Sequence, residues 1–454
     1  MTELIKKALE TADETKAISF GKDVNKETGP MFAELFPGKK VFVVADENTY
    51  GVVGDVVVAS LKDAGVEFAA DPYIFPGTPT LYGGYENVEL IREVMRPYED
   101  TVAVSLGAGT LNDIVKLAAG EIDWPYINVC TAASVDGFAS FGASIAKDGF
   151  KITRNCPAPA GLVADVDTMR EAPARLTATG YGDLIEKIPA GADWILAHEL
   201  GVEEIDDYVW SLVQGPLRKS LADPVAVANA EEEAIALLGE GQLMSGLAMQ
   251  AHKSSRPASG AGHQFSHTWE MEGHGLDWEP PLSHGFKVGV GTVASCAIWE
   301  VFLEMDVEDF DVQKALDRAK TPEEVEANVR ATLNENIQDE SVKHSVGKLM
   351  QGDALVERIE LLKEKWPTIK ERCTEQLVTA KEAMEMLKAS GAPYHPEMIE
   401  VGMDRFRETH FKAQMIRPRY TILDILTDLG ILDDVVEKLF SPDGFWGQHP
   451  HPDA

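Results

Sequence analysis

The first third of the chain alternates short apolar runs with amphipathic segments. Residues 39–46 (KKVFVVAD) have the pattern of a buried strand, and residues 53–65 (VGDVVVASLKDAG) follow with helical spacing. This alternation continues through five predicted strands, at 39–46, 67–75, 100–109, 126–134 and 160–169. Because helical segments separate successive strands, the pattern predicts a parallel sheet of the Rossmann-like kind.

The pattern changes near residue 167. From residue 171 onward apolar positions recur every three or four residues, and segments 223–253 and 373–391 are typical of helices in a bundle. We therefore expect a Rossmann-like α/β domain over residues 1–167 and an all-helical domain over 168–454. The last segment, 441–454 (SPDGFWGQHPHPDA), is expected to be a loop or disordered.

Size and charge narrow the classes of function. A chain of 454 residues exceeds what one hydrophobic core usually supports, which favours two domains. A net charge of −34, from 75 acidic and 41 basic residues, repels nucleic acid and anionic membranes, so neither is an expected partner. No apolar run reaches the roughly 20 residues of a membrane span, and the charged N-terminal stretch has no signal-peptide pattern. We expect a cytoplasmic protein, whose four widely spaced cysteines are reduced thiols.

Three turns that follow predicted strands have residues suited to a dinucleotide. In SLGAGTLNDIVK (105–116), Gly107 and Gly109 would let backbone amides approach a pyrophosphate, although two glycines are also common in purely structural turns. Asp46 follows the first of these strands, where an acid can bind ribose hydroxyls or simply cap a helix. In the third turn, CTAASVDGFASFGAS (130–144), small polar residues could bind a cofactor and Asp136 a substrate hydroxyl, or the segment could be an ordinary capped turn.

Five of the eleven histidines gather between residues 252 and 284, at His252, His263, His267, His274 and His284. His263 and His267 are spaced i, i+4, which places them on one face if the segment is helical. The last one follows a PPLS loop and begins another predicted helix. An isolated histidine pair is usually structural, but this density favours a metal site.

A carboxylate for that site is available upstream. In GYGDLIEK (180–187), we expect Asp183 to begin a helix after a glycine turn. Two histidines and one carboxylate make a three-ligand site with an open position, which suits a catalytic divalent metal. Zinc, nickel and iron all accept these ligands, so the sequence does not select among them.

Together these segments resemble a known family. The motifs, in order, are GAGTLNDIVK, TAASVDGFAS, GYGDLIEK, SSRPASGAGHQFSHTWEM and HGFKVGVGT. The chain resembles the sn-glycerol-1-phosphate dehydrogenases, most closely the bacterial branch. These enzymes belong to the superfamily of metal-dependent (iron-, zinc- or nickel-containing) alcohol dehydrogenases, with glycerol dehydrogenase and dehydroquinate synthase. The resemblance covers roughly residues 39–295 and implies a dehydroquinate synthase-like fold, an α/β domain followed by a helical bundle.

The resemblance also implies residue roles. The metal ligands would be Asp183, His263 and His284. The substrate would be contacted by Asp136, Asp183 and His267. The catalytic residues would be Asp183, His263, His267 and His284. NAD(H) or NADP(H) would be held by the first domain, with Asp46 near the adenosine ribose; its other implied contacts are Gly107, Ala108, Gly109, Thr110, Leu111, Thr131, Ser134 and Ser140. The helical domain would bind metal and substrate, and the enzyme would be a homodimer or larger homo-oligomer.

Some positions depart from the family or stay without a role. Ala108 stands in a turn where the family usually has three glycines, a small change. Gly262 stands where bacterial relatives tend to have an acid before the ligand histidine, which could alter how that ligand is oriented. His252 and His274 have no role that the resemblance supplies.

The implied reaction is reversible reduction of dihydroxyacetone phosphate by NAD(P)H, with the metal as Lewis acid. The phosphate-binding residues cannot be named from the sequence. A polyol or other sugar-phosphate dehydrogenase with the same site therefore stays open as an alternative, as does a lyase of the dehydroquinate synthase kind. A non-catalytic NAD-binding protein is a further alternative, which the intact ligand set disfavours.

Overall fold

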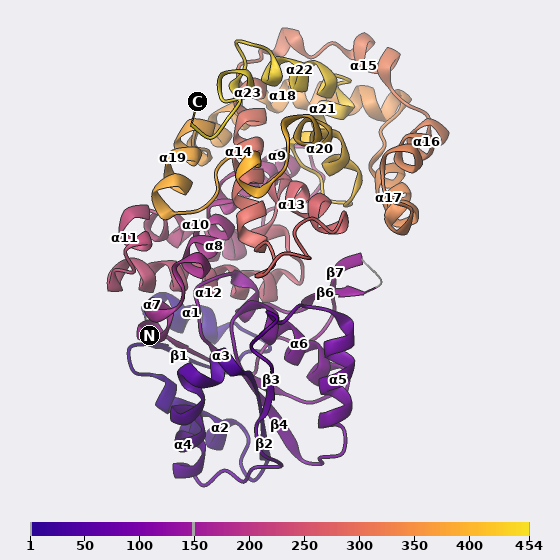
Figure 1. The fold of residues 1–454 in the computed structure, drawn as a ribbon. Helices are drawn as coiled ribbons and strands as arrows, with labels where there is room; N and C mark the ends of the chain where they lie inside the picture. Colours follow the sequence, from indigo (N-terminus) through magenta and orange to yellow (C-terminus); the bar gives the residue numbers. More distant parts are fainter. Residues whose placement is uncertain (1, 148–149, 454) are drawn as a thin grey trace. The chain divides into compact units, whose positions relative to one another are not determined.

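The computed structural model describes residues 2–147 and 150–453 (Figure 1). Six strands form one parallel sheet in the order β1-β8-β5-β4-β2-β3, and β6 pairs with β7 in an antiparallel hairpin. The strands are β1 (Ala17–Gly21), β2 (Lys40–Asp46), β3 (Tyr73–Phe75), β4 (Thr101–Leu106), β5 (Tyr126–Cys130), β6 (Ala143–Lys147), β7 (Phe150–Arg154) and β8 (Gly161–Asp165).

Helices lie between the strands and then take over the chain. Those up to the last strand are α1 (Glu3–Glu10), α2 (Thr28–Leu35), α3 (Glu47–Thr49), α4 (Asp55–Asp63), α5 (Tyr85–Met95) and α6 (Gly109–Gly120), with short turns η1 (Asn25–Glu27), η2 (Tyr50–Gly54) and η3 (Asp136–Ala139). Those that follow, up to residue 303, are α7 (Val166–Glu171), α8 (Ala174–Ile185), α9 (Lys187–Glu199), α10 (Asp207–Ser220), α11 (Pro224–Ala228), α12 (Glu232–His252), η4 (Arg256–Ala258), α13 (Ala261–Met271) and α14 (His284–Leu303).

The remaining residues described, 304–453, are also helical. They form η5 (Val307–Asp309), α15 (Val312–Arg318), α16 (Pro322–Thr332), α17 (Glu335–Lys348), α18 (Gly352–Gln376), α19 (Ala380–Ser390), η6 (Pro396–Ile399), α20 (Met403–Met415), α21 (Ile422–Asp428), α22 (Leu432–Phe440) and α23 (Phe445–Gln448). The predicted fold class, a Rossmann-like parallel sheet followed by an all-helical part, is confirmed.

Each of the five predicted strands contains an observed strand. The strand expected at 67–75 is shorter than the pattern suggested and occupies only its last three residues. Two features had no local signal. Strand β1 pairs with β8, which lies far along the chain, and the β6–β7 hairpin was not predicted.

Helices cover both faces of the sheet, so its central strands are buried. Helices α5 and α6 pack on one face, and α2 and α4 pack on the other. Every residue of β4 and β5 is buried, which explains their continuous apolar sequences. In such a sheet, ligands bind outside the carboxyl ends of the strands. The turns that follow β2, β4 and β5 lie there.

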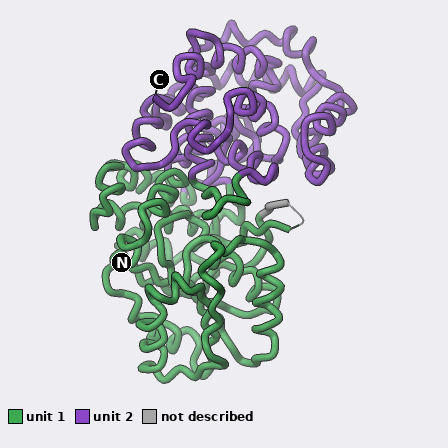
Figure 2. The backbone as a smooth tube through the Cα atoms, in the orientation of Figure 1, with its two compact units in different colours: residues 1–184, 208–255, 275–285 green, residues 185–207, 256–274, 286–454 purple. Residues whose placement is uncertain are grey.

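The chain forms two compact units that interleave along the sequence (Figure 2). One comprises residues 1–184, 208–255 and 275–285, and the other comprises 185–207, 256–274 and 286–454. The first unit contains the sheet and its covering helices, while the described part of the second is helical throughout. The predicted boundary near residue 167 marks the change from alternating to helical structure. As a domain boundary it stays a prediction.

The end of the chain is more ordered than predicted. The segment expected to be a loop or disordered contains α23, and Trp446 on this helix is 1% exposed. Its ring meets Phe406 edge to face, with centroids 4.8 Å apart. A tryptophan that buries its ring stabilises a short helix that its polar neighbours would not. The prediction of a loop or disorder was therefore wrong for Phe445–Gln448.

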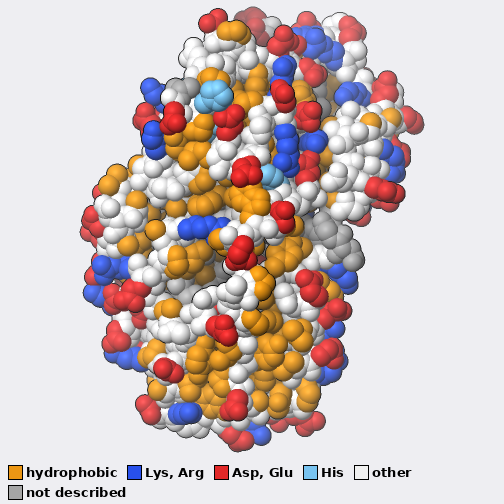
Figure 3. Space-filling view, in the orientation of Figure 1, with side chains coloured by type: hydrophobic (Ala, Val, Ile, Leu, Met, Phe, Trp, Pro, Cys, Tyr) orange, Lys and Arg blue, Asp and Glu red, His pale blue; other side chains and the backbone are white. Residues whose placement is uncertain are grey.

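Helix α14 is the only helix in the described chain that is long and apolar enough to cross a membrane. However, 78% of its most apolar window is buried inside the protein, as in the core helix of a soluble protein. Figure 3 shows acidic and basic side chains scattered over the visible face rather than collected in one block. Helix α14 is therefore a mostly buried core helix of this fold.

Candidate active site and metal centre

The glycine turn between β4 and α6 is shaped by close contacts. A Cβ atom on Gly107 would lie 2.8 Å from Cβ of Leu111, and one on Gly109 would lie 3.0 Å from Cγ1 of Val135. Helix α6 has no acidic side chain in its first turn, and Ala108 at its N-cap makes no side-chain cap. The first amides of α6 therefore have neither a side-chain cap nor a local negative charge, which suits an anion such as a pyrophosphate.

The side chains of this turn differ in exposure. Thr110 is exposed and Ala108 is half-buried, whereas Leu111 is 4% exposed and belongs to the core between the sheet and α6. Of the predicted contacts here, Leu111 can reach a cofactor only through its backbone.

Asp46 caps a helix. It is the last residue of β2, and its Oδ1 accepts a hydrogen bond of 2.8 Å from the backbone N–H of Thr49. In return, the Asp46 N–H lies 3.1 Å from Oγ1 of Thr49, which completes a capping box. Asp46 thus has the helix-capping role that the sequence offered as an alternative, and its contact with the ribose stays a prediction.

A buried lysine holds the loop that follows β5. Lys116 is 1% exposed, and its Nζ donates to the carbonyl oxygens of Gly137 (2.8 Å), Ser140 (2.9 Å) and Gly142 (3.0 Å). Three backbone acceptors and nearby Asp113, at 3.6 Å, compensate the buried ammonium. Sequence reasoning missed this residue, although it is the only cation in the apolar run LNDIVKLAAG.

The polar residues of this loop are partly used by the loop itself. Ser140 is buried, and its Oγ donates to the carbonyl of Gly137 at 3.1 Å. Ser134 is also buried, while Thr131 directly after β5 is half-buried. Of the three, Thr131 has the most exposed side chain.

Asp136 begins η3 and is tied to the predicted metal ligand. Its backbone N–H donates to Oδ2 of Asp183 at 3.1 Å, and its own Oδ2 accepts a bond of 2.7 Å from Oγ of Ser245. Ser245, on α12, has no signal in the sequence that marks this role. The loop expected to orient the substrate therefore shares a hydrogen bond with a residue expected to hold the metal.

Asp183 lies in the last turn of α8, so the prediction that it begins a helix after a glycine turn is wrong. Gly180, three residues before it, has a packing role instead. A Cβ atom on Gly180 would collide with the carbonyl oxygen of Ala133. Glycine here permits a helix to approach the loop after β5 closely, and this packing requirement was misread as a turn.

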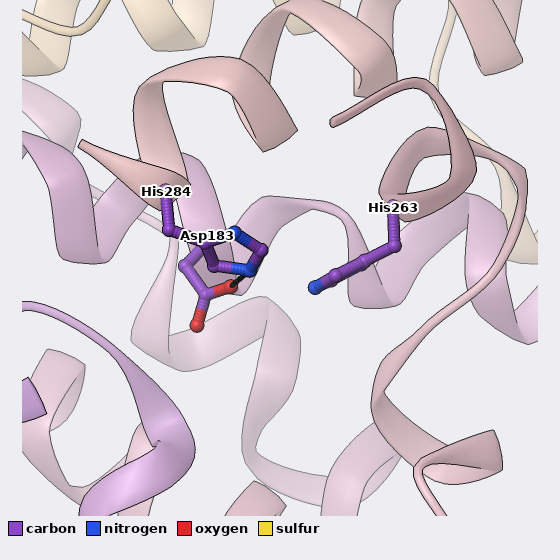
Figure 4. Close-up of side chains that lie close together, drawn as sticks. All are labelled: Asp183, His263 and His284. Carbon is purple, nitrogen blue, oxygen red and sulfur yellow. Dashed lines mark ion pairs between the residues drawn. The ribbon is translucent and has the colours of Figure 1, made fainter. Parts of the chain in front are cut away.

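The three predicted metal ligands come together. One ligand atom each from Asp183, His263 and His284 can be chosen so that all lie within 4.8 Å of one another (Figure 4). Nε2 of His284 is 3.9 Å from Oδ1 of Asp183, and the carboxylate is fully buried. Two imidazoles and one carboxylate form the donor set of a catalytic divalent-metal site. The i, i+4 pair on α13 and the start of α14 at His284 are confirmed.

A second carboxylate, not predicted, contacts one of these ligands. Oε2 of Glu186 lies 2.8 Å from Nδ1 of His263, and Glu186 is fully buried. The signal was present but weak, because Glu186 follows Asp183 by three residues in GDLIEK.

His267 takes part in a different buried network. Its Nδ1 lies 3.3 Å from Oε2 of Glu270, whose Oε1 is 3.2 Å from Nζ of Lys287. Its ring centroid is 5.9 Å from that of His263. Both Glu270 and Lys287 are at most 2% exposed, so this ion pair compensates part of each buried charge.

The other two histidines of the cluster have partners outside the predicted ligand group. Nδ1 of His252 bonds to Oγ of Ser254 at 2.9 Å. Nε2 of His274 bonds to the carbonyl of Ile399 at 2.6 Å, and burial lowers the pKa of this imidazole. Neither residue belongs to the group of ligand atoms around Asp183.

The start of α13, which carries His263, is anchored by Asp193. Its carboxylate accepts bonds from the backbone N–H of Ala261 (2.7 Å) and Ile422 (2.9 Å) and from Nε1 of Trp299 (3.2 Å). Burial raises the pKa of Asp193 to about 7, although the two backbone N–H groups act in the opposite direction. This carboxyl group supports the helix without touching a predicted ligand.

Comparison with known proteins places the chain among alcohol dehydrogenases. Residues 19–173 match the sequence profile of the iron-containing alcohol dehydrogenases. The chain is 36% identical to the glycerol-1-phosphate dehydrogenase (NAD(P)+) of Halalkalibacterium halodurans, over 60% of this chain and 67% of that protein. It is also 36% identical to the protein of the same name from Pyrococcus horikoshii, over 61% of this chain and 77% of that protein. Matches to further bacterial proteins of that name cover 62–64% of their length.

Solved structures share the fold at low sequence identity. A probable glycerol dehydrogenase from Sinorhizobium meliloti superposes with a TM-score of 0.58 at 15% identity, covering 93% of this chain and 98% of that protein. This similarity concerns the fold alone.

Proposed function

The chain belongs to the glycerol-1-phosphate dehydrogenase family, and on that premise we propose that it reduces dihydroxyacetone phosphate reversibly to sn-glycerol 1-phosphate. As a member it is an NAD(P)-linked oxidoreductase that acts on CH–OH groups and depends on a divalent metal. The observation that carries the proposal for this chain is the convergence of Asp183, His263 and His284.

The residues around this group fit a divalent cation. Asp183 is a buried carboxylate, and a bound cation would compensate its charge. Nδ1 of His263 is engaged by Glu186, which leaves Nε2 as the nitrogen for a metal. A divalent metal held by the three residues would polarise the oxygens of the substrate as a Lewis acid.

The protein's own side chains would orient the substrate. Asp136 is fixed by Ser245 and by Asp183, so its carboxylate is held still and can accept a bond from a substrate hydroxyl. His267, held at Nδ1 by Glu270, can present Nε2 to the substrate and pass a proton. Both residues are proposed as substrate contacts.

Residues 1–167 would hold the cofactor, and residues 168–454 would hold metal and substrate. NAD(P)H supplies the hydride. Its pyrophosphate would meet the amides of the glycine turn, from Gly107 to Leu111, and its ribose would lie near Asp46. The other proposed contacts are Thr131, Ser134 and Ser140. We propose a cytoplasmic homodimer that binds neither nucleic acid nor membrane.

The test is a coupled comparison of substrates and metals. NADH and NADPH oxidation would be followed with dihydroxyacetone phosphate beside dihydroxyacetone, on protein loaded in turn with zinc, nickel and iron. Strong turnover only with the phosphorylated ketone supports the proposal and names the working metal.

The remaining outcomes separate the alternatives. Turnover only with dihydroxyacetone would make the protein a polyol dehydrogenase and overturn the proposed substrate. Binding of NAD(H) without net reduction of either ketone would favour the lyase or the non-catalytic alternative. Light scattering of the same sample would show whether it is a dimer.

A further inference from the structure

We propose that Glu186 is a positioning residue for the metal ligand His263, which it orients and holds in one tautomer. The inference rests on the proposed metal site and goes beyond it, because no predicted role includes Glu186. The contact that carries it is the 2.8 Å approach of Oε2 to Nδ1 of His263.

The direction of this hydrogen bond follows from the chemistry of its partners. An ionised carboxylate only accepts, so Nδ1 of His263 must carry the proton. The neutral ring then has its lone pair on Nε2, which is the form a metal requires. Glu186 thereby selects the tautomer in which Nε2 is the ligand atom, and it makes that nitrogen more basic.

The second oxygen of Glu186 is fixed as well. Oε1 accepts a bond of 3.0 Å from the backbone N–H of Gly260, which directly precedes α13. Both carboxylate oxygens therefore serve the first turn of the helix that carries His263. Glu186 is fully buried, so water does not compete for either bond.

Gly262 makes room for this arrangement. A Cβ atom there would lie 2.8 Å from Cγ of Glu186 and 3.1 Å from the backbone N of Thr292. Any side chain at this position would push against the glutamate stem. The departure noted in the sequence, glycine before the ligand histidine, thus coincides with a carboxylate that reaches the histidine from another helix end.

Glutamine is the sharp test of this role. Glu186 accepts two N–H bonds, one at each oxygen, and a glutamine has one oxygen and one NH₂ group. In Glu186→Gln, the NH₂ group of the glutamine must therefore face either Nδ1–H of His263 or the backbone N–H of Gly260. Two donors then face each other, and one hydrogen bond is lost. The shape of the side chain is kept while the orienting bond or its anchor is lost.

The experiment measures metal binding in wild type and variants. Affinity for Zn²⁺ would be measured by chelator competition, and the absorption spectrum of the Co²⁺-loaded protein would report the ligand geometry. In Glu186→Gln we expect affinity to fall about 10- to 100-fold, the usual effect of losing such an orienting group, with a changed Co²⁺ spectrum. Glu186→Asp keeps the charge but is one methylene shorter. Its zinc affinity should lie between that of wild type and that of Glu186→Gln.

Asp193→Asn is the matched control. Asp193 is also buried and also bonds the start of α13, at Ala261, but it does not contact His263. This variant should unfold at a lower temperature and yet keep the wild-type zinc affinity, within about threefold, and the wild-type Co²⁺ spectrum. An equal loss in both variants would reduce Glu186 to a structural role.

Two further results would overturn the inference. One is that Glu186→Gln binds Zn²⁺ as tightly as wild type and has the wild-type Co²⁺ spectrum. If that variant does not fold, the same result in Glu186→Asp would count. The other is a structure of zinc-loaded wild type in which His263 binds the metal through Nδ1. If wild type binds no metal at all, it is the proposed function that fails.

Discussion

The proposed cofactor turn and the metal-ligand group are built in opposite ways. The turn between β4 and α6 consists of neighbouring residues, and its fit depends on missing side chains at Gly107 and Gly109. The ligand group gathers side chains from separate helices, and buried acids hold them. Backbone amides need little further support, whereas a buried imidazole or carboxylate must be oriented by a partner.

This difference predicts where substitutions act. Around the ligand group, removal of one side chain should abolish a chemical function while the sheet stays folded. In the turn, the proposed binding groups are backbone amides, so substitutions there and at the residues that support the neighbouring loop should act mainly through the shape of the backbone. Substitutions at four positions test this contrast, from the largest expected effect to the smallest.

His284→Ala should have the largest effect. It removes one of three ligands, so we expect loss of metal retention and a decrease in turnover of more than about 100-fold, because even orienting groups cost 10- to 100-fold. Metal content after gel filtration and steady-state rates would measure this, with circular dichroism to show that the fold remains.

The matched control is His252→Ala, a histidine of the same cluster that bonds to a nearby serine hydroxyl and does not belong to the predicted ligand group. It should retain metal and activity. Full activity in His284→Ala would remove this residue from the ligand set.

Lys116→Met tests whether the loop near the cofactor depends on a buried side chain after all. Three carbonyl groups would lose their donor, so the free energy of unfolding should fall by about 3 kcal/mol. The Michaelis constant for NAD(P)H should rise, since the loop is released. Denaturant unfolding would measure the first effect.

The control is Lys219→Met, at an exposed position on α10, which should change stability by less than about 0.5 kcal/mol. Equal stability of the two variants would show that the loop holds its shape without Lys116, and would sharpen the contrast between the regions.

The pH dependence of stability should report Asp193. Burial raises its pKa to about 7 in the folded protein, with Arg256 acting to lower it and Glu186 to raise it. The stability contributed by the neutral carboxyl group is fully present below its unfolded pKa of about 4 and is lost as the pH rises toward 7. Ionisation of Asp193 should therefore lower the free energy of unfolding by up to about 1.4 kcal/mol for each pH unit between pH 4 and 7.

Asp193→Asn cannot ionise, so its melting temperature should fall less steeply than that of wild type between pH 4 and 7. Asp428, whose pKa burial also raises to about 7, would keep part of the slope. If the melting temperatures of the metal-free wild type and variant changed with pH by the same amount, the assignment to Asp193 would be contradicted.

Asp46 should give the smallest effect. Asp46→Ala removes both the helix cap and any ribose contact, while Asp46→Ser keeps a side chain that can cap. We expect both variants to lose affinity for NADH relative to NADPH by about fivefold, or roughly 1 kcal/mol. Only Asp46→Ala should also lose stability. An unchanged cofactor preference in both would confine Asp46 to its capping role.

Local patterns predicted most of the first region. The apolar runs gave the buried strands β2, β4, β5 and β8, because a strand covered on both faces must be apolar along its length. Strand β1 escaped detection, since its partner lies at the far end of the sheet domain. Asp183 was predicted to be a metal ligand, and it lies close to His263 and His284 although its place in a helix was predicted incorrectly.

The sequence by itself determined the chemical types and their order: glycines after a buried strand, a histidine pair one helical turn apart, and an acid upstream of them. Their partners were decided only by tertiary structure. Glu186 at His263, Ser245 at Asp136 and Lys116 beneath the loop after β5 are ordinary residues in their local sequences. The physical reason is burial, because a polar group away from water must find its partner wherever the fold brings one.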